Sequence, residues 1–485
     1  MNLVFGASSY IGTNLVPFLL AEGRAVRATA RHLEVLEARD WQGCQLIRAD
    51  ALEPETLDAA LEGIDVAYYL VHSMAAGPNF PELDAQAARN FAAAAARHGV
   101  QRIVYLGGLA PPTPVSRHLK SRRETGDILR RSPVAVTEIR AGIVVGPGSA
   151  AYEVIRDLVN HLPVMLTPRW VRSRSTPIAL SNVLRYLADA PMLAATANKI
   201  YDISGPEVLT YEALMRQYGE LIGKHPWIIP VPVLSPRLSS YWLRLITSVP
   251  TNVGRALIDG LSQDIIARPS GLGELIPQRL LTFREAARAA LEATRLHAVP
   301  ARWVETATSC ETFRPEYSFY PKRVSDTADT IASAAAIWRV LCRIGGDDGY
   351  FYANSLWWLR RAMDWCLGGP SFRRRRRHPD KLRVGDVVDA WRVIALEPDR
   401  RLTLLMEMKA LGAGVLEFEI ENRGDRRVVR ATAYWHPAGV FGLLYWYALL
   451  PAHAFLFAGL TRSLARRAER LEGSSRHDTE NLPAP

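Results

Sequence analysis

Cysteine is scarce in this sequence: 485 residues include only Cys44, Cys310, Cys342 and Cys366, and no two form a C-x-x-C pair. Such wide spacing excludes a disulfide framework and a zinc site built from paired cysteines. We therefore expect no metal, and reduced, partly buried thiols as in a cytosolic protein. The sequence also opens without a basic segment and a long apolar run, so we expect no signal peptide and a cytoplasmic location.

An excess of acidic residues is also missing, since 59 Lys and Arg outnumber 49 Asp and Glu and give a net charge of +10. Much of the basic excess lies in the run Arg373–Arg377 and in the segment Arg462–Arg470. The first run is most simply a solvated loop, and a phosphate or lipid-headgroup site is the alternative. It has no interleaved aromatic residues and no recognisable nucleic-acid module around it, so we expect no nucleic-acid partner.

Residues 1 to about 140 alternate short apolar runs with helical patterns. Nearly continuous apolar runs are typical of parallel strands that are covered on both faces. The repeated strand–helix–strand pattern predicts an α/β domain with a Rossmann-type, doubly wound parallel sheet. The strands are expected at Asn2–Phe5, Ala25–Ala30, Cys44–Arg48, Asp65–Leu70, Arg102–Leu106 and Val134–Ile139, and helices at Ile11–Ala21 and Ala85–Arg97.

The pattern changes twice further along the chain. Residues 141–290 are rich in proline and predict a small substrate subdomain that completes a first domain of residues 1–290. Residues 318–465 predict a second, α+β domain, with a strand at Pro321–Ser325, a helix at Ser333–Arg343 and an aromatic helical stretch at Tyr350–Cys366. Antiparallel strands follow, because apolar residues alternate from Leu402 to Met408 between turn signals. The polar segment 473–485 is expected to be disordered.

The loop between the first strand and the first helix reads Gly6-Ala7-Ser8-Ser9-Tyr10-Ile11-Gly12. Gly6 permits a tight turn and Gly12 close packing of the helix, whose first backbone N–H groups can bind a pyrophosphate. Ser9 replaces the usual middle glycine and can offer its hydroxyl to phosphate. The alternative is a plain strand–helix turn. We expect a dinucleotide site in which Ser8, Tyr10 and Ile11 also take part.

Arg31 and Asp50 follow the second and third predicted strands. An NAD-binding protein usually has an acidic residue at the first of these positions, whereas Arg31 can pair with the 2′-phosphate of NADP(H). NAD(H) is therefore the less favoured cofactor, and a solvated arginine is the alternative. Asp50, followed by Ala51, can accept a hydrogen bond from adenine or cap the helix that begins near Pro54.

These residues resemble the short-chain dehydrogenase/reductase superfamily in its extended or atypical, NmrA-like branch. The resemblance covers residues 1–290 and includes the two loop glycines, Arg31, Asp50-Ala51, the strand end Leu70-Val71-His72-Ser73 and the stretch Arg140–Gly148. It implies that Val71 and His72 also contact the cofactor. The implied activity is that of an NADP(H)-dependent oxidoreductase.

The catalytic set of that family is missing from this sequence. Family reductases use a serine and a Tyr-x-x-x-Lys motif, which align with Gly107-Gly108 and with His118 and Arg122. His118 can still serve as an acid and Arg122 can hold a ribose or phosphate. A surface or capping histidine is the simpler interpretation. Two hypotheses remain: an oxidoreductase acting on an apolar substrate, or a non-catalytic protein that senses NADP(H), binds lipid or serves in assembly.

Residues 318–465 resemble the uncharacterised DUF2867 domain, which often follows an NmrA-like domain and is related to START-like (SRPBCC) helix-grip folds. The matching stretches include Gly345–Tyr350, Gly385–Trp391 and Tyr445–Trp446–Tyr447. The resemblance implies a curved sheet around a long helix and an apolar ligand. Six side chains can line the cavity or simply fill the core: Trp357, Trp358, Trp365, Trp391, Met406 and Met408. Asp386 and Asp389 are expected to serve in turns and caps.

The apolar segment Val440–Leu460 has about the length of a membrane span. Pro451 and His453 lie inside it, the aromatic triplet is not at an end, and the basic flank would lie on the wrong side for a cytosolic cofactor domain. A buried helix, or one lying on a membrane surface, explains both the apolar run and the basic flank. Peripheral membrane contact is thus the expected form of any membrane association.

Overall fold

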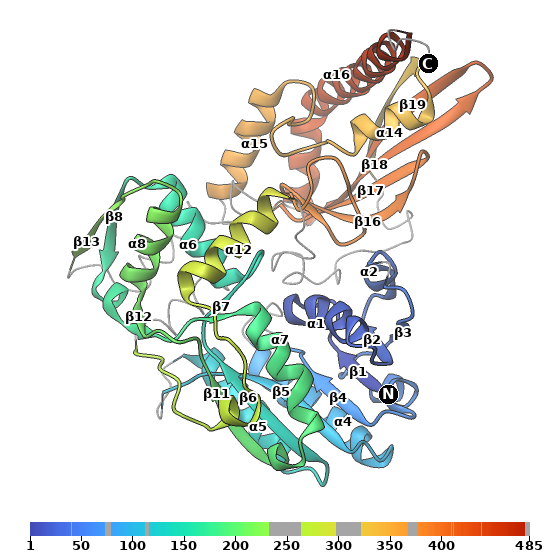
Figure 1. Ribbon diagram of the computed structural model, residues 1–485. Helices are drawn as coiled ribbons and strands as arrows, with labels where there is room; N and C mark the ends of the chain where they lie inside the picture. Colours follow the sequence, from blue (N-terminus) through green and yellow to red (C-terminus); the bar gives the residue numbers. More distant parts are fainter. Residues whose placement is uncertain are drawn as a thin grey trace. The chain divides into compact units, whose positions relative to one another are not determined.

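The computed structural model describes residues 1–39, 41–72, 79–111, 116–231, 263–296, 322–366, 376–408, 410, 412–437 and 439–480. The chain divides into two compact units, Met1–Ser309 and Cys310–Pro485. Figure 1 shows the elements of both units, and each unit is described by itself below.

A parallel sheet of seven strands forms the centre of the first unit, in the order β11-β6-β5-β4-β1-β2-β3 (Figure 1). The chain winds outward from β1 in both directions, which makes this the expected doubly wound, Rossmann-type sheet. The strands are β1 (Asn2–Phe5), β2 (Val26–Ala30), β3 (Gln45–Arg48), β4 (Val66–Tyr69), β5 (Arg102–Gly108), β6 (Ala135–Ala141) and β11 (Lys199–Ile203).

Both faces of this sheet are buried, as the apolar runs predict. Leu3 and Phe5 belong to one core and Val4 to the other, because successive side chains of a strand point to opposite faces. The first core contains residues of α3 (Leu57–Leu61), α4 (Phe80–Arg97) and α5 (Arg117–Arg130). The second contains residues of α1 (Tyr10–Ala21), α2 (Leu33–Glu37) and α7 (Leu180–Asp189).

Residues after β6 form a smaller layer with a core of its own. Three two-stranded sheets belong to it: β7 (Val144–Val145) with β10 (Ile178–Ala179), β8 (Val164–Pro168) with β13 (Trp227–Val231), and β9 (Arg174–Ser175) with β12 (Leu209–Thr210). Its helices are α6 (Ala150–His161), α8 (Tyr211–Leu221) and α12 (Phe283–Arg295), whereas α11 (Leu272–Leu275) packs into the core of the large sheet. A capping box of Thr282 and Glu285 begins α12.

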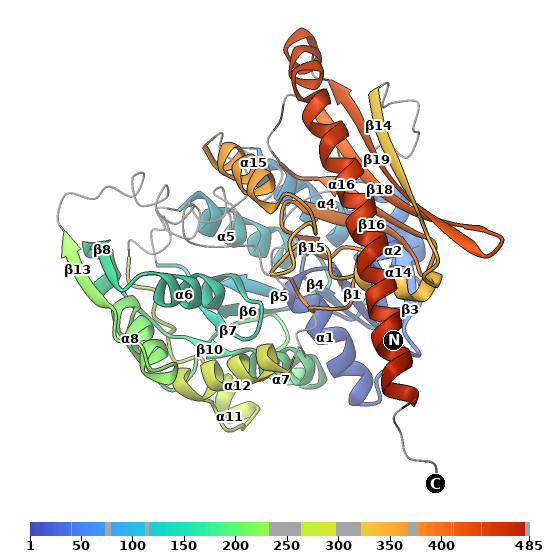
Figure 2. The ribbon, with the colours of Figure 1, turned by 90° about the horizontal axis from the view of Figure 1, so that it is seen from above.

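The second unit is an antiparallel sheet of six strands in the order β14-β19-β18-β17-β16-β15. Alternate residues such as Leu402, Leu404 and Phe418 face the core, which two helices close with Leu341 and Leu464. The elements are β14 (Lys322–Thr330), α14 (Ala334–Leu341), α15 (Asn354–Cys366), β15 (Val387–Val388), β16 (Trp391–Glu397), β17 (Arg401–Met406), β18 (Gly412–Arg423), β19 (Arg426–Pro437) and α16 (Gly439–Glu480). Figure 2 shows α16 running along the sheet. The expected α+β layer is present, while a START-like relationship stays a prediction.

The last helix differs from the expectation in its length. It begins at Gly439 but continues to Glu480, well beyond the expected end at Leu460. It therefore includes residues 473–480 of the tail that we expected to be disordered, while 481–485 lie outside the described residues. Once the first turns of a helix have formed, each further residue extends the helix at little cost in free energy. Polar composition alone therefore did not predict the residue at which α16 ends.

Candidate functional site

The loop after β1 has the shape that its glycines predict. Gly6 has a φ of 89°, a conformation that favours glycine, and a Cβ there would lie 3.0 Å from Val71 Cγ2. A Cβ on Gly12 would lie 2.5 Å from the carbonyl oxygen of Gly6. The loop thus folds tightly against the end of β4 and the start of α1. Strand order places this point between β1 and β4, where doubly wound sheets bind their ligands.

Ser9 caps the helix that follows the loop. Its hydroxyl oxygen accepts a hydrogen bond from the Gly12 amide at 3.1 Å, and its carbonyl accepts one from Thr13 at 2.8 Å. The first four amides of a helix have no partner within the helix by α-helical geometry. Of these four, the Gly12 amide donates to the Ser9 hydroxyl and the Ser9 amide donates to the Gly6 carbonyl at 3.0 Å, which leaves the amides of Tyr10 and Ile11, beside Ser8, for an anion. This cradle fits a pyrophosphate, although binding of one by these residues stays a prediction.

Tyr10 turns its ring away from solvent and under the loop after β6. The side chain is buried, and this burial raises the pKa of its hydroxyl far above the usual value. A Cβ on Gly146 would lie 2.7 Å from the Tyr10 hydroxyl oxygen. A glycine is therefore needed at position 146 to make room for Tyr10. Gly146 belongs to the stretch 140–148 that is part of the resemblance.

Arg31 and Asp50 both follow the ends of their strands, as expected. Arg31 is exposed directly after β2. The Asp50 carboxylate accepts a hydrogen bond from the Leu52 amide at 2.9 Å, a turn rather than the helix cap that we considered. The short 3₁₀ helix Pro54–Thr56 has Glu53 before it instead. Ala51 is buried and its carbonyl accepts a hydrogen bond from Asn90. The roles of these residues toward a cofactor stay predictions.

Three residues from two places in the chain meet beside this loop: His72 after β4, and His118 and Arg122 in the first turns of α5. The imidazole rings lie edge to face, with centroids 6.3 Å apart. Loss of solvation is the larger cause that lowers the pKa of His118 well below 6.5, and the Arg122 cation adds to it. The same two causes lower the pKa of His72, although its ring is exposed at the edge of the site. Both rings are therefore neutral at pH 7.

Arg122 occupies the space beside Gly108, one of the two glycines, Gly107 and Gly108, that the resemblance aligns with the serine of the family. A Cβ on Gly108 would lie 3.5 Å from Arg122 Cδ. The guanidinium donates a hydrogen bond to the Leu106 carbonyl and lies 5.7 Å from the centre of the Tyr105 ring, whose hydroxyl donates to the Arg122 carbonyl at 2.9 Å. The absent serine and the arginine at the lysine position are thus parts of one local arrangement.

The sequence analysis missed a buried carboxylate behind this site. Asp84 of α4 accepts a hydrogen bond from the Ser121 hydroxyl at 2.8 Å, and both side chains are buried. The negative charge of Asp84 acts on the pKa of His72 against the effect of Arg122. A signal was available: Asp84 stands four residues before Ala88 and seven before Phe91, on the buried stripe of its helix.

The polar residues singled out in the second unit are mostly engaged in ion pairs. Arg377 binds the buried Asp386 carboxylate through two nitrogens, at 2.9 and 3.1 Å, and Arg361 binds Asp389 at 2.8 Å. Arg376 donates to the Ile344 carbonyl at 2.7 Å. Arg376 and Arg377 are therefore not part of a solvated loop, because Asp386 pairs with Arg377 and the carbonyls of Cys342 and Ile344 accept hydrogen bonds from Arg376. Residues Arg373–Arg375 lie outside the described residues.

The expected cavity-lining residues separate into two groups. Trp391 is buried, and Trp357, Met406 and Met408 pack against the same core, as core-filling residues do. Trp358 is 60% exposed, so it does not line an interior cavity. The side chain of Trp365 lies outside the described residues. Among the residues that the structure describes, no group of three or more His, Cys, Asp or Glu could hold a metal ion.

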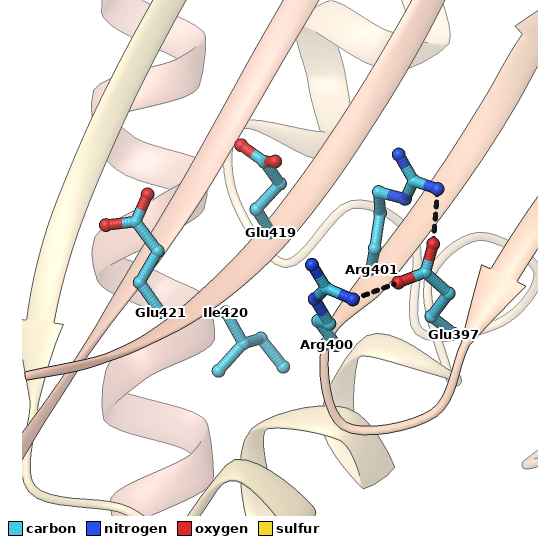
Figure 3. Close-up of a pocket in the computed structure, with 6 residues that line it drawn as sticks. All are labelled: Glu397, Arg400, Arg401, Glu419, Ile420 and Glu421. Carbon is cyan, nitrogen blue, oxygen red and sulfur yellow. Dashed lines mark hydrogen bonds and ion pairs between the residues drawn. The ribbon is translucent and has the colours of Figure 1, made fainter.

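A pocket of about 470 Å³ opens at the turn between β16 and β17, beside the far half of β18 (Figure 3). Arg400 and Arg401 both point to Glu397, with an Arg400–Glu397 distance of 3.1 Å. Glu419, Ile420 and Glu421 complete the lining. Because the lining is charged and its arginines are paired, this pocket does not fit the apolar ligand implied by the resemblance.

Comparison with known proteins agrees with the division into two units. Residues 6–160 match the NAD(P)H-binding family, and residues 324–460 match DUF2867, a protein family of unknown function. A segment of 110 residues is 34% identical to cinnamoyl-CoA reductase 1 of Oryza sativa subsp. japonica, and covers 21% of this chain and 32% of that protein. The match thus spans about a third of the rice enzyme.

Solved structures similar to this chain cover its first unit. Triphenylmethane reductase of Citrobacter sp., complexed with NADP(H), is 19% identical with a TM-score of 0.50, over 60% of this chain and 99% of that one. The NADPH-dependent quinone oxidoreductase of Escherichia coli is 20% identical with a TM-score of 0.50, over 60% and 100%. At such low identity these likenesses establish the fold alone. The chain thus joins an N-terminal NAD(P)H-binding domain with a Rossmann-type fold to a C-terminal DUF2867 domain.

Proposed function

We propose that the first unit binds NADP(H) and transfers a hydride to an apolar acceptor. The observation that carries the cofactor choice is the exposed arginine at the end of β2, where a ribose-binding acid would select NAD(H). Arg31 would hold the 2′-phosphate, and the Tyr10 and Ile11 amides the pyrophosphate. Asp50, Ala51, Val71 and His72 would line the remainder of the cofactor site.

The chemistry that NADPH supplies when bound is a hydride at the nicotinamide ring. Reduction of a carbonyl-type acceptor also leaves negative charge on an oxygen. Arg122 would stabilise such a charge, because arginine carries a permanent positive charge in proteins. His118 is neutral and can donate a hydrogen bond through its ring N–H, which makes it a weaker acid than an imidazolium. Acceptors that give a stable anion, such as quinones, therefore suit this site best.

Calorimetry with NADPH and NADH tests the cofactor assignment. We expect wild-type protein to prefer NADPH, and the Arg31→Glu variant to lose that preference. Arg131→Glu makes the same change of charge at another exposed arginine and serves as the control. No heat with either nucleotide, or a preference that survives Arg31→Glu, would contradict the assignment.

Turnover is tested separately, with NADPH and a panel of quinones, aldehydes and triphenylmethane dyes. The quinones and dyes are the acceptors named for the two reductases of the same fold. Loss of turnover in His118→Ala and in Arg122→Gln, with NADPH binding retained, supports an enzyme.

The second candidate function is a non-catalytic NADP(H)-sensing protein. It is favoured by the absence of the serine, tyrosine and lysine and by the way Arg122 occupies the space beside Gly108. Tight binding of NADPH without turnover of any acceptor in the panel would support this function over the reductase.

A further inference from the structure

Exposed apolar side chains of the second unit are concentrated on two helices. Seven large ones, each between 39% and 61% exposed, lie on α15 and α16; Ile331 is the one other exposed large apolar residue among the described residues of this unit. On α15 they are Leu356, Trp358, Leu359 and Met363, and on α16 Leu444, Tyr447 and Phe455. A patch of this kind on a soluble protein marks an interaction site.

The two helices lie side by side, so their exposed residues belong to one surface. Both ribbon views place α15 beside the first half of α16 (Figures 1 and 2). Tyr352, just before α15, has its ring centroid 5.4 Å from that of Phe455, and a Cβ on Gly459 would collide with the Tyr352 ring. Arg360 of α15 is near enough to His453 to lower the pKa of that imidazole, after the larger effect of burial.

The outward face of α16 changes from apolar to basic along its length. Leu444, Tyr447 and Phe455 are exposed in the first half, and Arg462, Arg466 and Arg470 are exposed in the second. The arginines stand four residues apart, which places them on one side of the helix, in line with Phe455. The same side thus offers an apolar surface and then a row of cations.

The two acidic side chains of α16 that the structure describes, Glu469 and Glu472, point the other way. The Glu469 carboxylate accepts a hydrogen bond from the Thr330 hydroxyl at 2.7 Å, and Glu472 accepts one from the Ser333 amide at 2.8 Å. Lys322 adds a cation to the patch, because its ammonium donates to the Tyr447 hydroxyl at 3.0 Å. Among the side chains that the structure describes on the outward face of α16, the charge is therefore of one sign, which favours an anionic partner and repels a second copy of the same surface.

We propose that the surface formed by α15 and the outward face of α16 docks on an anionic lipid bilayer. Trp358, Tyr447 and Phe455 would enter the interfacial layer, as aromatic side chains do, and the three arginines would meet acidic headgroups. The arrangement is that of a helix lying in the interface plane. The inference is independent of the reaction proposed for the first unit.

The inward face of α16 argues against a membrane-spanning role. By length and composition the segment Leu444–Gly473 could cross a membrane, and a third of its apolar window is buried within the protein. Trp446, Phe457, Leu460, Leu464 and Ala468 are all at most 4% exposed and belong to the core or lie against the sheet. Insertion across a bilayer would remove these side chains from the sheet, whereas docking on the surface leaves them in place.

Co-sedimentation of the full-length protein with vesicles tests the proposal. Vesicles of phosphatidylcholine alone are compared with vesicles in which a third of the lipid is phosphatidylserine. We expect binding to the anionic vesicles that weakens with salt. Arg462→Gln, Arg466→Gln and Arg470→Gln together should weaken it by about fivefold per arginine. The matched control replaces the exposed Arg268, Arg288 and Arg295 of the first unit by Gln.

A second variant tests the apolar part of the surface. Leu444→Ser, Tyr447→Ser and Phe455→Ser together should abolish binding to both kinds of vesicle, while the exposed Met192, Val208 and Leu296, changed to Ser, should not. Unchanged circular dichroism and thermal midpoint show that the variants are folded. Three results would overturn the proposal: no binding of folded wild-type protein to anionic vesicles, a dimer that the serine variant dissociates, or cellular protein that resists extraction at alkaline pH.

Discussion

The imidazole of His72 stands edge to face against that of His118, with ring centroids 6.3 Å apart, and a single guanidinium, that of Arg122, acts on both. The two histidines come from opposite ends of a long stretch of sequence and meet because β4 and β5 are neighbours in the sheet. Because both rings share this electrostatic environment, the stability of the protein should depend on pH in a direction that can be predicted.

Acidification should destabilise the protein through these two residues. A histidine whose folded pKa lies below the unfolded value near 6.5 binds fewer protons in the folded state. Its stabilising contribution is complete above pH 6.5 and is lost as the pH falls from 6.5 toward the folded pKa. We expect the free energy of unfolding to decrease over that range, measured by urea denaturation. His118→Gln should flatten the dependence, and His225→Gln, at an exposed ring, should leave it unchanged.

Replacement of Arg122 and Asp84 should move the histidine pKa values in opposite directions. Arg122→Gln removes a cation that disfavours the imidazolium, so the pKa of both rings should rise. Asp84→Asn removes a carboxylate that favours the charged form of His72, so the pKa of His72 should fall further. NMR titration of the imidazole C2 protons measures both changes. A His72 pKa that is the same in both variants as in the wild-type protein would show that His72 does not interact with Arg122 or Asp84.

Gly12→Ala should disrupt the nucleotide loop itself. The new methyl group would lie 2.5 Å from the Gly6 carbonyl oxygen and 2.7 Å from Ala7 Cα, so the backbone must shift. We expect a loss of about 1–3 kcal/mol in the free energy of unfolding and loss of NADPH binding. Gly23→Ala is the control for the close contact. Gly23 also has a φ that favours glycine, 73°, but a Cβ there meets nothing within 4 Å. Wild-type affinity in Gly12→Ala would show that the cradle does not hold the nucleotide.

Much of the first unit could be predicted because its signals are local. A continuous apolar run such as Asn2–Phe5 identifies a buried parallel strand, and the structure gives β1 those bounds. The conformation of Gly6 is equally local, since strand, loop and helix follow one another directly. The fold class and the position of the loop therefore followed from short stretches of sequence.

Contacts that join distant elements could not be predicted in this way. Ser121 and Asp84 are 37 positions apart and meet only because α4 and α5 pack together. Arg377 was interpreted as part of a solvated basic run, yet it pairs with the buried Asp386. A charged residue in a polar stretch looks the same in sequence whether or not its partner is buried nearby.

Removal of the cation from the buried ion cluster of α6 should strongly destabilise the protein. Arg156 donates hydrogen bonds to Glu153 at 2.5 Å and to Asp157 at 2.9 Å, and all three residues are at most 5% exposed. Burial lowers the pKa of Arg156, but the two carboxylates outweigh that effect and raise it. Arg156→Met would leave two buried carboxylates without their cation, at a cost of about 3–5 kcal/mol.

The pH dependence of the stability of Arg156→Met distinguishes the loss of an ion pair from the loss of side-chain packing. Without the arginine, the two carboxylates would bind protons more readily in the folded state than in the unfolded one. The stability deficit of Arg156→Met against wild type should therefore be larger at pH 7 than at pH 5. Arg89→Met, at an exposed arginine of α4, should change the free energy of unfolding by less than about 0.5 kcal/mol. A deficit that is the same at both pH values would mean that Arg156 stabilises α6 by packing and not by its charge.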